Sequence, residues 1–116
     1  METELHRHNL GNSDGITLVF YAYPEHTDPT DNDEFYDTKE KKQKLYDQLN
    51  RYELVYFIAC IKAYKLGVEL SSEYLGNCLY ESYEEFIDDT NDYIGDMKET
   101  VISEAKTRIK HLKAFL

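Results

Sequence analysis

The chain has 116 residues, the length of one domain, which excludes two independent hydrophobic cores. It carries 23 Asp and Glu against 13 Lys and Arg, a formal net charge of −10, so its surface as a whole is unsuited to binding a nucleic-acid backbone directly. A domain of this size buries enough surface to fold without a metal or a disulfide, so we expect one domain over residues 1–116 and no cofactor.

The N-terminal residues indicate where the protein resides. Residues 1–10 contain no apolar segment like that of a secretion signal, and their acids are atypical of transit peptides. The longest apolar run, 54–61, is less than half of the ~20 residues that a membrane-spanning helix needs. We therefore expect a cytoplasmic protein that does not bind membranes. Its mobile segments are predicted to be an N-terminal arm (1–14) and an acidic loop (25–37).

The first half of the chain predicts a strand, a loop and a helix. Residues 15–23 are rich in β-branched and aromatic residues and end before Pro24, which indicates a strand. The acidic loop follows. Residues 38–51 contain good helix formers, and Thr38 is a suitable cap. Because this helix can act as a crossover between two strands, parallel and antiparallel pairing of the first strand both remain open.

An antiparallel hairpin is predicted over about 53–75. Its first strand, 53–64, is apolar at its centre on both faces, as expected for a central strand covered on both sides or shielded by a helix. Gly67 can adopt the positive φ of a tight turn between the two strands. Gly76 and Asn77 would then end or bulge the second strand.

Two further helices are predicted after the hairpin. Ser82 followed by Glu85 is a capping-box pattern that starts a short helix. The last helix has an apolar stripe at steps of three and four, formed by Ile94, Met97, Val101, Ile102, Ala105, Ile109 and Leu112. We therefore expect an α+β fold, in which two to three helices pack on a small, mainly antiparallel sheet of about three strands and the longest helix is C-terminal.

The sequence contains no motif for catalysis or metal binding. None of the common hydrolase, nucleotide-binding or metalloprotease fingerprints is present. His6, His8 and His26 lack a fourth ligand at a fixed spacing, so we expect no metal site. Cys60 and Cys78 lie in apolar contexts without C-x-x-C spacing, which predicts buried, reduced thiols. We therefore predict that the protein is not an enzyme.

Acidic residues form the one pattern with functional content. Between Glu81 and Glu99 they recur at helical steps of three and four against the single Lys98. Most of them would share one helix face opposite the buried residues. The candidate partner-binding residues are Glu81, Glu84, Glu85, Asp88, Asp89, Asp92, Asp96 and Glu99, with Tyr83 and Tyr93 adding specificity and Asp28, Asp31, Asp33 and Glu34 contributed by the acidic loop.

This acidic stripe has a structural and a functional interpretation. A run of charge is usually a solvated helix face. However, each like-charge pair at this spacing costs a helix a few tenths of a kcal/mol, and the spacing of about 5–6 Å is close to the rhythm of phosphates along a nucleic-acid strand. Direct binding of nucleic acid is disfavoured, because Tyr80, Tyr83 and Tyr93 are flanked by acids instead of Lys or Arg.

The segment 67–87, with the sequence GVELSSEYLGNCLYESYEEFI, resembles a group of small acidic accessory proteins encoded by phages, prophages and plasmids. Such proteins include inhibitors of host defence, among them antirestriction and anti-CRISPR proteins, several of which imitate DNA with surface carboxylates. The resemblance covers about the C-terminal half of the chain, chiefly the hairpin and the following helix. It implies a mobile-element protein that inhibits a defence protein of a bacterial host.

Our leading hypothesis is a non-enzymatic protein-binding module whose carboxylates replace phosphates in the basic, nucleic-acid-binding cleft of a host protein. Two alternatives remain. One is a structural or regulatory homodimer, formed through the exposed side of 54–61 or through the tail residues Leu112, Phe115 and Leu116. The other is a small-molecule enzyme or sensor with a pocket between the hairpin and the helices.

Overall fold

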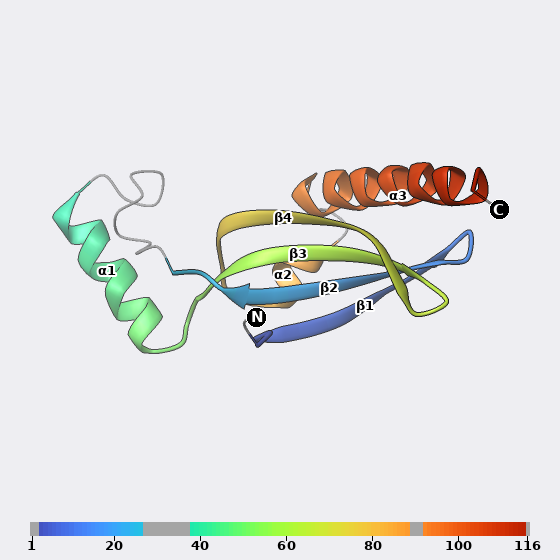
Figure 1. Cartoon of the computed structure of the whole chain (residues 1–116). Coiled ribbons are helices and arrows are strands. Elements are labelled where there is room, and N and C mark those ends of the chain that lie inside the picture. Colours follow the sequence, from blue (N-terminus) through green and yellow to red (C-terminus); the bar gives the residue numbers. More distant parts are fainter. Residues whose placement is uncertain (1–2, 27–37, 89–91, 116) are drawn as a thin grey trace.

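The computed structural model describes residues 3–26, 38–88 and 92–115. These residues form a four-stranded antiparallel sheet and three helices, and the strands lie side by side in the order β1-β2-β3-β4 (Figure 1). The elements are β1 (His6–Ser13), β2 (Ile16–Pro24), α1 (Lys39–Asn50), β3 (Val55–Lys65), β4 (Val68–Tyr80), α2 (Tyr83–Ile87) and α3 (Asp92–Lys113). The predicted α+β fold with its longest helix at the C-terminus is confirmed.

Two tight turns connect the outer pairs of strands. Asp14 and Gly15 join β1 to β2, and Leu66 and Gly67 join β3 to β4. All four residues have positive φ, with 55° and 78° in the first turn and 52° and 78° in the second. Two-residue hairpin turns of the I′ type require this conformation, because its twist matches that of the flanking strands. The predicted hairpin with its turn at Gly67 is therefore confirmed.

The hairpin carries the bulge that its glycine predicted. The pairing of β3 with β4 shifts register between Phe57 and Ala59, opposite Gly76 and Asn77. Asn77 has a φ of 55°, and its backbone N–H donates to the carboxylate of Glu25 at 2.8 Å. The strand then continues to Tyr80, because the bulge bends β4 without ending it.

Strands β2 and β3 pair antiparallel, from Thr17 opposite Tyr64 to Pro24 opposite Phe57. The connection that contains α1 therefore leaves and re-enters the sheet at the same end, and the parallel alternative is excluded. Figure 1 shows α1 standing off that end of the sheet. The helix starts where the sequence predicts, since the Thr38 hydroxyl accepts a hydrogen bond from the backbone N–H of Lys41 at 3.2 Å.

Strand β1 raises the strand count above the predicted three. Within β1 only His6 and Leu10 are half-buried, and the other residues are exposed. The pairing also shifts register between Asn9 and Gly11, where Gly11 has a φ of 106°. An edge strand of this kind is held by its backbone pairing with β2, so its side chains lack the alternating apolar pattern that identifies a strand. The segment expected as an N-terminal arm therefore contributes an edge strand.

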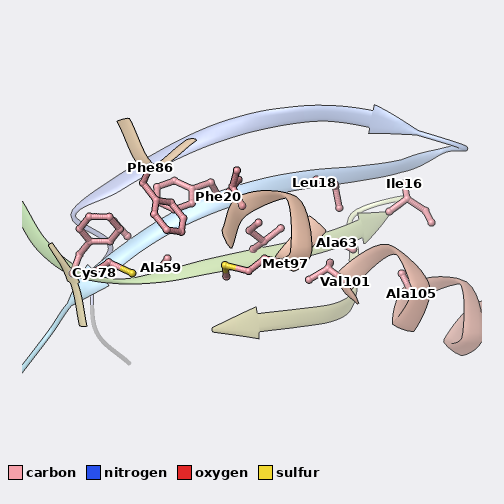
Figure 2. Close-up of a cluster of buried hydrophobic side chains, with 14 of the residues drawn as sticks. Ile16, Leu18, Phe20, Ala59, Ala63, Cys78, Phe86, Met97, Val101 and Ala105 are labelled. Atoms are coloured by element: carbon pink, nitrogen blue, oxygen red, sulfur yellow. The ribbon is translucent and has the colours of Figure 1, made fainter. Parts of the chain in front are cut away.

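Helices α2 and α3 cover one face of the sheet and enclose the core between them. Figure 2 shows Phe20 and Phe86 together at one end of this core, and Met97, Val101 and Ala105 of α3 along the rest of it. Small residues on β3 allow α3 to approach the sheet closely. The buried residues of the core are Ile16, Leu18, Phe20, Ala22, Phe57, Ala59, Ile61, Ala63, Leu70, Cys78, Phe86, Ile94, Met97, Val101 and Ala105.

The predicted apolar stripe of α3 is only partly buried. Its central residues belong to the core, whereas Ile102 and Ile109 pack at the margin and Leu112 is 48% exposed. A hydrogen bond of 2.7 Å from the Ser71 hydroxyl to the carbonyl of Val101 holds α3 against β4. Among the described residues, no helix combines the length and apolar character needed to cross a membrane.

Candidate functional site

The predicted acidic stripe is exposed wherever the structure describes it. Its residues lie on α2, on the residues just before and just after it, and on the first half of α3, and the other sides of these helices pack on the sheet. We call this the acidic surface, and it consists of Glu81, Glu84, Glu85, Asp88, Asp92, Asp96 and Glu99. The candidates Asp28, Asp31, Asp33, Glu34 and Asp89 lie outside the described residues.

Some of these carboxylates also stabilise helix ends. The Ser82 hydroxyl accepts a hydrogen bond from the backbone N–H of Glu85 at 3.2 Å, and the Glu85 carboxylate accepts one from the backbone N–H of Glu81 at 3.0 Å. This reciprocal pair is the predicted capping motif. Asp92 lies in the first turn of α3, where the helix dipole favours a negative charge. Glu85 and Asp92 thus have local structural roles.

Three other carboxylates have no such role. The side chains of Glu84, Asp96 and Glu99 are exposed and make no hydrogen bond or ion pair within the part of the chain that the structure describes. They project from helices that are anchored by Phe86, which is fully buried, and by Ile94, which is 1% exposed. Their charges are therefore presented to solvent from a rigid support.

The two tyrosines predicted to assist partner binding differ in accessibility. Tyr93 is 58% exposed. Tyr83 is half-buried, because its ring stacks on His6 with 4.7 Å between centroids and meets the edge of Phe57 at 5.1 Å. Burial raises the pKa of Tyr83 above its ordinary value. Tyr83 therefore connects α2 to the sheet, and Tyr93 is the one whose ring stands at the acidic surface.

The sheet face opposite α2 and α3 carries an aromatic cluster that sequence reasoning missed. We call it the tyrosine face, and it comprises Tyr21, Tyr23, Tyr64, Tyr74, Arg7, Cys60 and Lys62. One row crosses all four strands, because Arg7 lies opposite Tyr21, Tyr21 opposite Cys60, and Cys60 opposite Tyr74. Alternate residues of a strand lie on the same face, and Tyr21 and Tyr23 are such residues of β2. This alternation in β2 and β3 is the sequence pattern that could have identified the tyrosine face.

Polar contacts hold the side chains of the tyrosine face in place. The hydroxyls of Tyr21 and Tyr64 are 2.8 Å apart, and the Arg7 guanidinium lies 5.1 Å from the centre of the Tyr21 ring. The Lys62 ammonium is 5.4 Å from the same ring and forms an ion pair of 3.2 Å with Glu69. Burial opposes the charge of Lys62, but the hydrogen bond with Glu69 and the nearby Tyr23 hold its pKa above the ordinary value. The cluster satisfies its own polar groups.

Both cysteines are free and buried, as their sequence contexts predict. Cys60 lies beneath the tyrosine face, and burial raises the pKa of its thiol to about 11, although a hydrogen bond with Tyr74 acts against this shift. Burial also raises the pKa of Cys78, in the core, to about 11. Since the thiolate is the reactive form, neither side chain is suited to act as a nucleophile at neutral pH.

The described residues include no group of three or more His, Cys, Asp or Glu side chains placed to hold a metal ion. Comparison of the chain with protein-family models, with curated proteins and with solved structures finds no match.

Proposed function

We propose that the protein is a non-enzymatic binding module whose acidic surface occupies a basic, nucleic-acid-binding surface of another protein. The observation that carries the proposal is the series of exposed carboxylates along α2 and the first half of α3. Each carboxylate would face a Lys or Arg that otherwise contacts a phosphate. The partner and not this chain is then the protein that binds nucleic acid.

Two physical properties support this function. The helices that carry the acidic surface are anchored in the core, so binding would order few additional groups and would lose little conformational entropy. The net charge of −10 would also attract a basic partner over long range and speed the encounter. Tyr93, which stands among the carboxylates, would supply an aromatic contact at the centre of the interface.

The resemblance of segment 67–87 to accessory proteins of phages and plasmids extends the proposal to a biological role. We propose that the partner is a defence protein of a bacterial host and that the complex forms in the host cytoplasm. Restriction enzymes and CRISPR effectors have basic channels for nucleic acid. A rigid acidic surface fits such a channel by charge.

The test compares two variants with equal changes in charge. The first, Glu84→Gln/Asp96→Asn/Glu99→Gln, neutralises carboxylates that have no hydrogen bond or ion pair within the described chain. The control, Glu40→Gln/Glu53→Gln/Glu104→Gln, neutralises three exposed acids elsewhere. Each protein is immobilised and used to capture proteins from bacterial extract, which are eluted with salt and identified by mass spectrometry.

We expect the wild type and the control variant to capture a nucleic-acid-binding protein that the first variant does not capture. A DNA duplex of the captured protein's preferred length should compete with the wild type for it. The association rate should fall more than the dissociation rate rises, and the difference should shrink with added salt. Equal capture by both variants, or simultaneous binding of DNA and this protein, would contradict the proposal.

A further inference from the structure

The C-terminal half of α3 and the start of β4 border an open groove that lies outside the acidic surface. Its volume is about 650 Å³. Leu70 and Ser71 of β4 form one wall, and the flank of α3 with Thr107 and Arg108 forms the other. Phe115, which is 88% exposed, lines the end of the groove. The groove is thus a partly apolar depression that is open to solvent.

The wall formed by β4 is also an edge of the sheet. β4 pairs with β3 on one side, and within the described residues no strand pairs with its other side. Beyond Leu70, where the pairing with β3 shifts register, such an edge offers a row of backbone donors and acceptors to an incoming strand. Val68, at its start, is 58% exposed. Edge hydrogen bonding and an adjoining apolar groove are the two parts of a site for an extended peptide.

The charge of the groove indicates what kind of peptide fits. From residue 105 to 113, α3 has no acidic residue and carries Lys106, Arg108, Lys110, His111 and Lys113. Lys110 and Lys113 complement the dipole at the helix end. Arg108 and His111 line the groove itself, and neither forms an ion pair within the described part of the chain. The other charged residue of the lining, Glu104, lies one turn earlier, so Arg108 is the charge that faces the C-terminal part of the groove.

We propose that this groove binds an extended, acidic and apolar segment of another protein, which adds a strand to the free edge of β4. Alternate side chains of such a strand point to the same face. Those that point toward α3 would place an apolar group against Leu70 and Phe115 and a carboxylate beside Arg108. The site lies at the opposite end of α3 from the first carboxylates of the acidic surface and does not depend on the function proposed for them.

The probe is a phage-displayed library of random nine-residue peptides, selected on the whole protein. In parallel, the selection uses Thr107→Trp, which fills the groove from an exposed position, and Arg108→Glu, which reverses its charge. The matched control is Lys110→Glu, which makes the same charge change on α3 at an exposed residue outside the groove. Melting curves identify any variant that does not fold. If one of the two groove variants fails to fold, the other is compared with the wild type and the control.

We expect enriched peptides to alternate apolar residues with others and to contain at least one Asp or Glu. Their affinity should fall at least tenfold on Thr107→Trp and Arg108→Glu and change less than twofold on Lys110→Glu. A bound peptide should slow amide hydrogen exchange in 68–75 at least tenfold, because new strand hydrogen bonds protect the edge.

Several outcomes would overturn the inference. One is enrichment no greater on the wild type than on Thr107→Trp. Another is protection of amides away from β4 and α3. Concentration-dependent doubling of the mass, lost in Thr107→Trp, would show that a second copy occupies the groove in place of a peptide. If peptide binding persists in Glu84→Gln/Asp96→Asn/Glu99→Gln, the groove acts independently of the acidic surface.

Discussion

The two faces of the sheet are both aromatic, but they use aromatic rings in different ways. On the face under α2 and α3, Phe20, Phe57 and Phe86 are fully buried and meet edge to face or tilted, with 5.7–6.2 Å between centroids. On the tyrosine face, Tyr21 and Tyr64 join their hydroxyls, and the cations of Arg7 and Lys62 lie over the rings. One face excludes water, whereas the other keeps a polar atom on nearly every ring.

This difference follows from the alternation of side chains along each strand. In β2 the residues Leu18, Phe20 and Ala22 point toward the helices, and Tyr21 between them points away. Tyrosine gives the open face apolar area to cover Cys60 while its hydroxyl remains hydrated or hydrogen-bonded. The helix face should therefore dominate stability, and the tyrosine face should add smaller contributions that depend on pH.

The largest expected effect is the burial of a charge on the helix face. Val101→Asp places a carboxylate at a fully buried position of α3, so we expect a loss of at least about 3 kcal/mol or failure to fold. Ile102→Asp is a matched change one residue along, at the partly buried margin, and should cost less. Urea unfolding of both variants measures the difference. Equal losses would show that α3 is rotated from the position described here.

The second effect is a fall in stability at alkaline pH. The pKa of both thiols is about 11 in the folded protein, compared with 9.0 for an ordinary thiol, so the unfolded chain loses these protons first. The stability they contribute is complete below pH 9 and is lost as the pH rises through 11. At about 1.4 kcal/mol per pKa unit, each buried thiol should account for up to about 3 kcal/mol of this loss.

Cysteine variants show how much each face of the sheet contributes to the loss of stability at alkaline pH. Cys60→Ala removes the thiol of the tyrosine face, and Cys78→Ala removes the thiol of the core. Each should flatten the decline in urea stability between pH 9 and 11, and the double variant should flatten it most. Tyr64, Tyr74 and Tyr23, whose pKa values burial also raises, should keep a residual decline in all variants. An unchanged slope in the double variant would contradict this assignment.

A smaller effect is expected from the polar contacts of the tyrosine face. Tyr64→Phe removes the hydroxyl that is 2.8 Å from that of Tyr21, so stability should fall by about 1 kcal/mol. Tyr52→Phe makes the same chemical change at a side chain that is 91% exposed and should be close to neutral. Thermal unfolding of the two variants provides the comparison. Equal melting temperatures would mean that the hydroxyl pair contributes nothing to the fold.

The sequence was informative where a local rule decides the structure. Ser82 and Glu85 specify a helix start through backbone hydrogen bonds within one turn, and Gly67 specifies a turn through its positive φ. These interactions involve near neighbours in the chain, so the residues alone reveal them. Strand β1 was missed because this edge strand is held by backbone pairing with β2. The pattern of side chains along the sequence gives almost no information about such pairing.

The surfaces were harder to predict, because residues from distant parts of the sequence become neighbours on them only in the folded structure. Helical spacing predicted that the acids between Glu81 and Glu99 avoid the buried side of a helix, and those that the structure describes are exposed, but they are divided between α2, α3 and the residues beside α2. The row of Arg7, Tyr21, Cys60 and Tyr74 comes from four strands, and its members become neighbours only when the strand order and register are known. The groove beside β4 likewise depends on how α3 crosses the sheet edge.

The smallest expected effect distinguishes carboxylates within the acidic surface. Asp92→Asn removes a charge from the first turn of α3, so a lost interaction with the helix dipole offsets the relief of repulsion between like charges. Asp96→Asn removes a charge one turn later, beyond the strongest part of the dipole, and repulsion alone is relieved. We expect Asp96→Asn to be neutral or stabilising by about 0.3 kcal/mol and Asp92→Asn to be neutral or slightly destabilising. Because both terms are screened, the difference measured by urea unfolding should vanish in 1 M salt. A stabilisation by Asp92→Asn as large as that by Asp96→Asn would show that repulsion across the whole surface outweighs the dipole, and the acidic surface would then oppose the fold along its entire length.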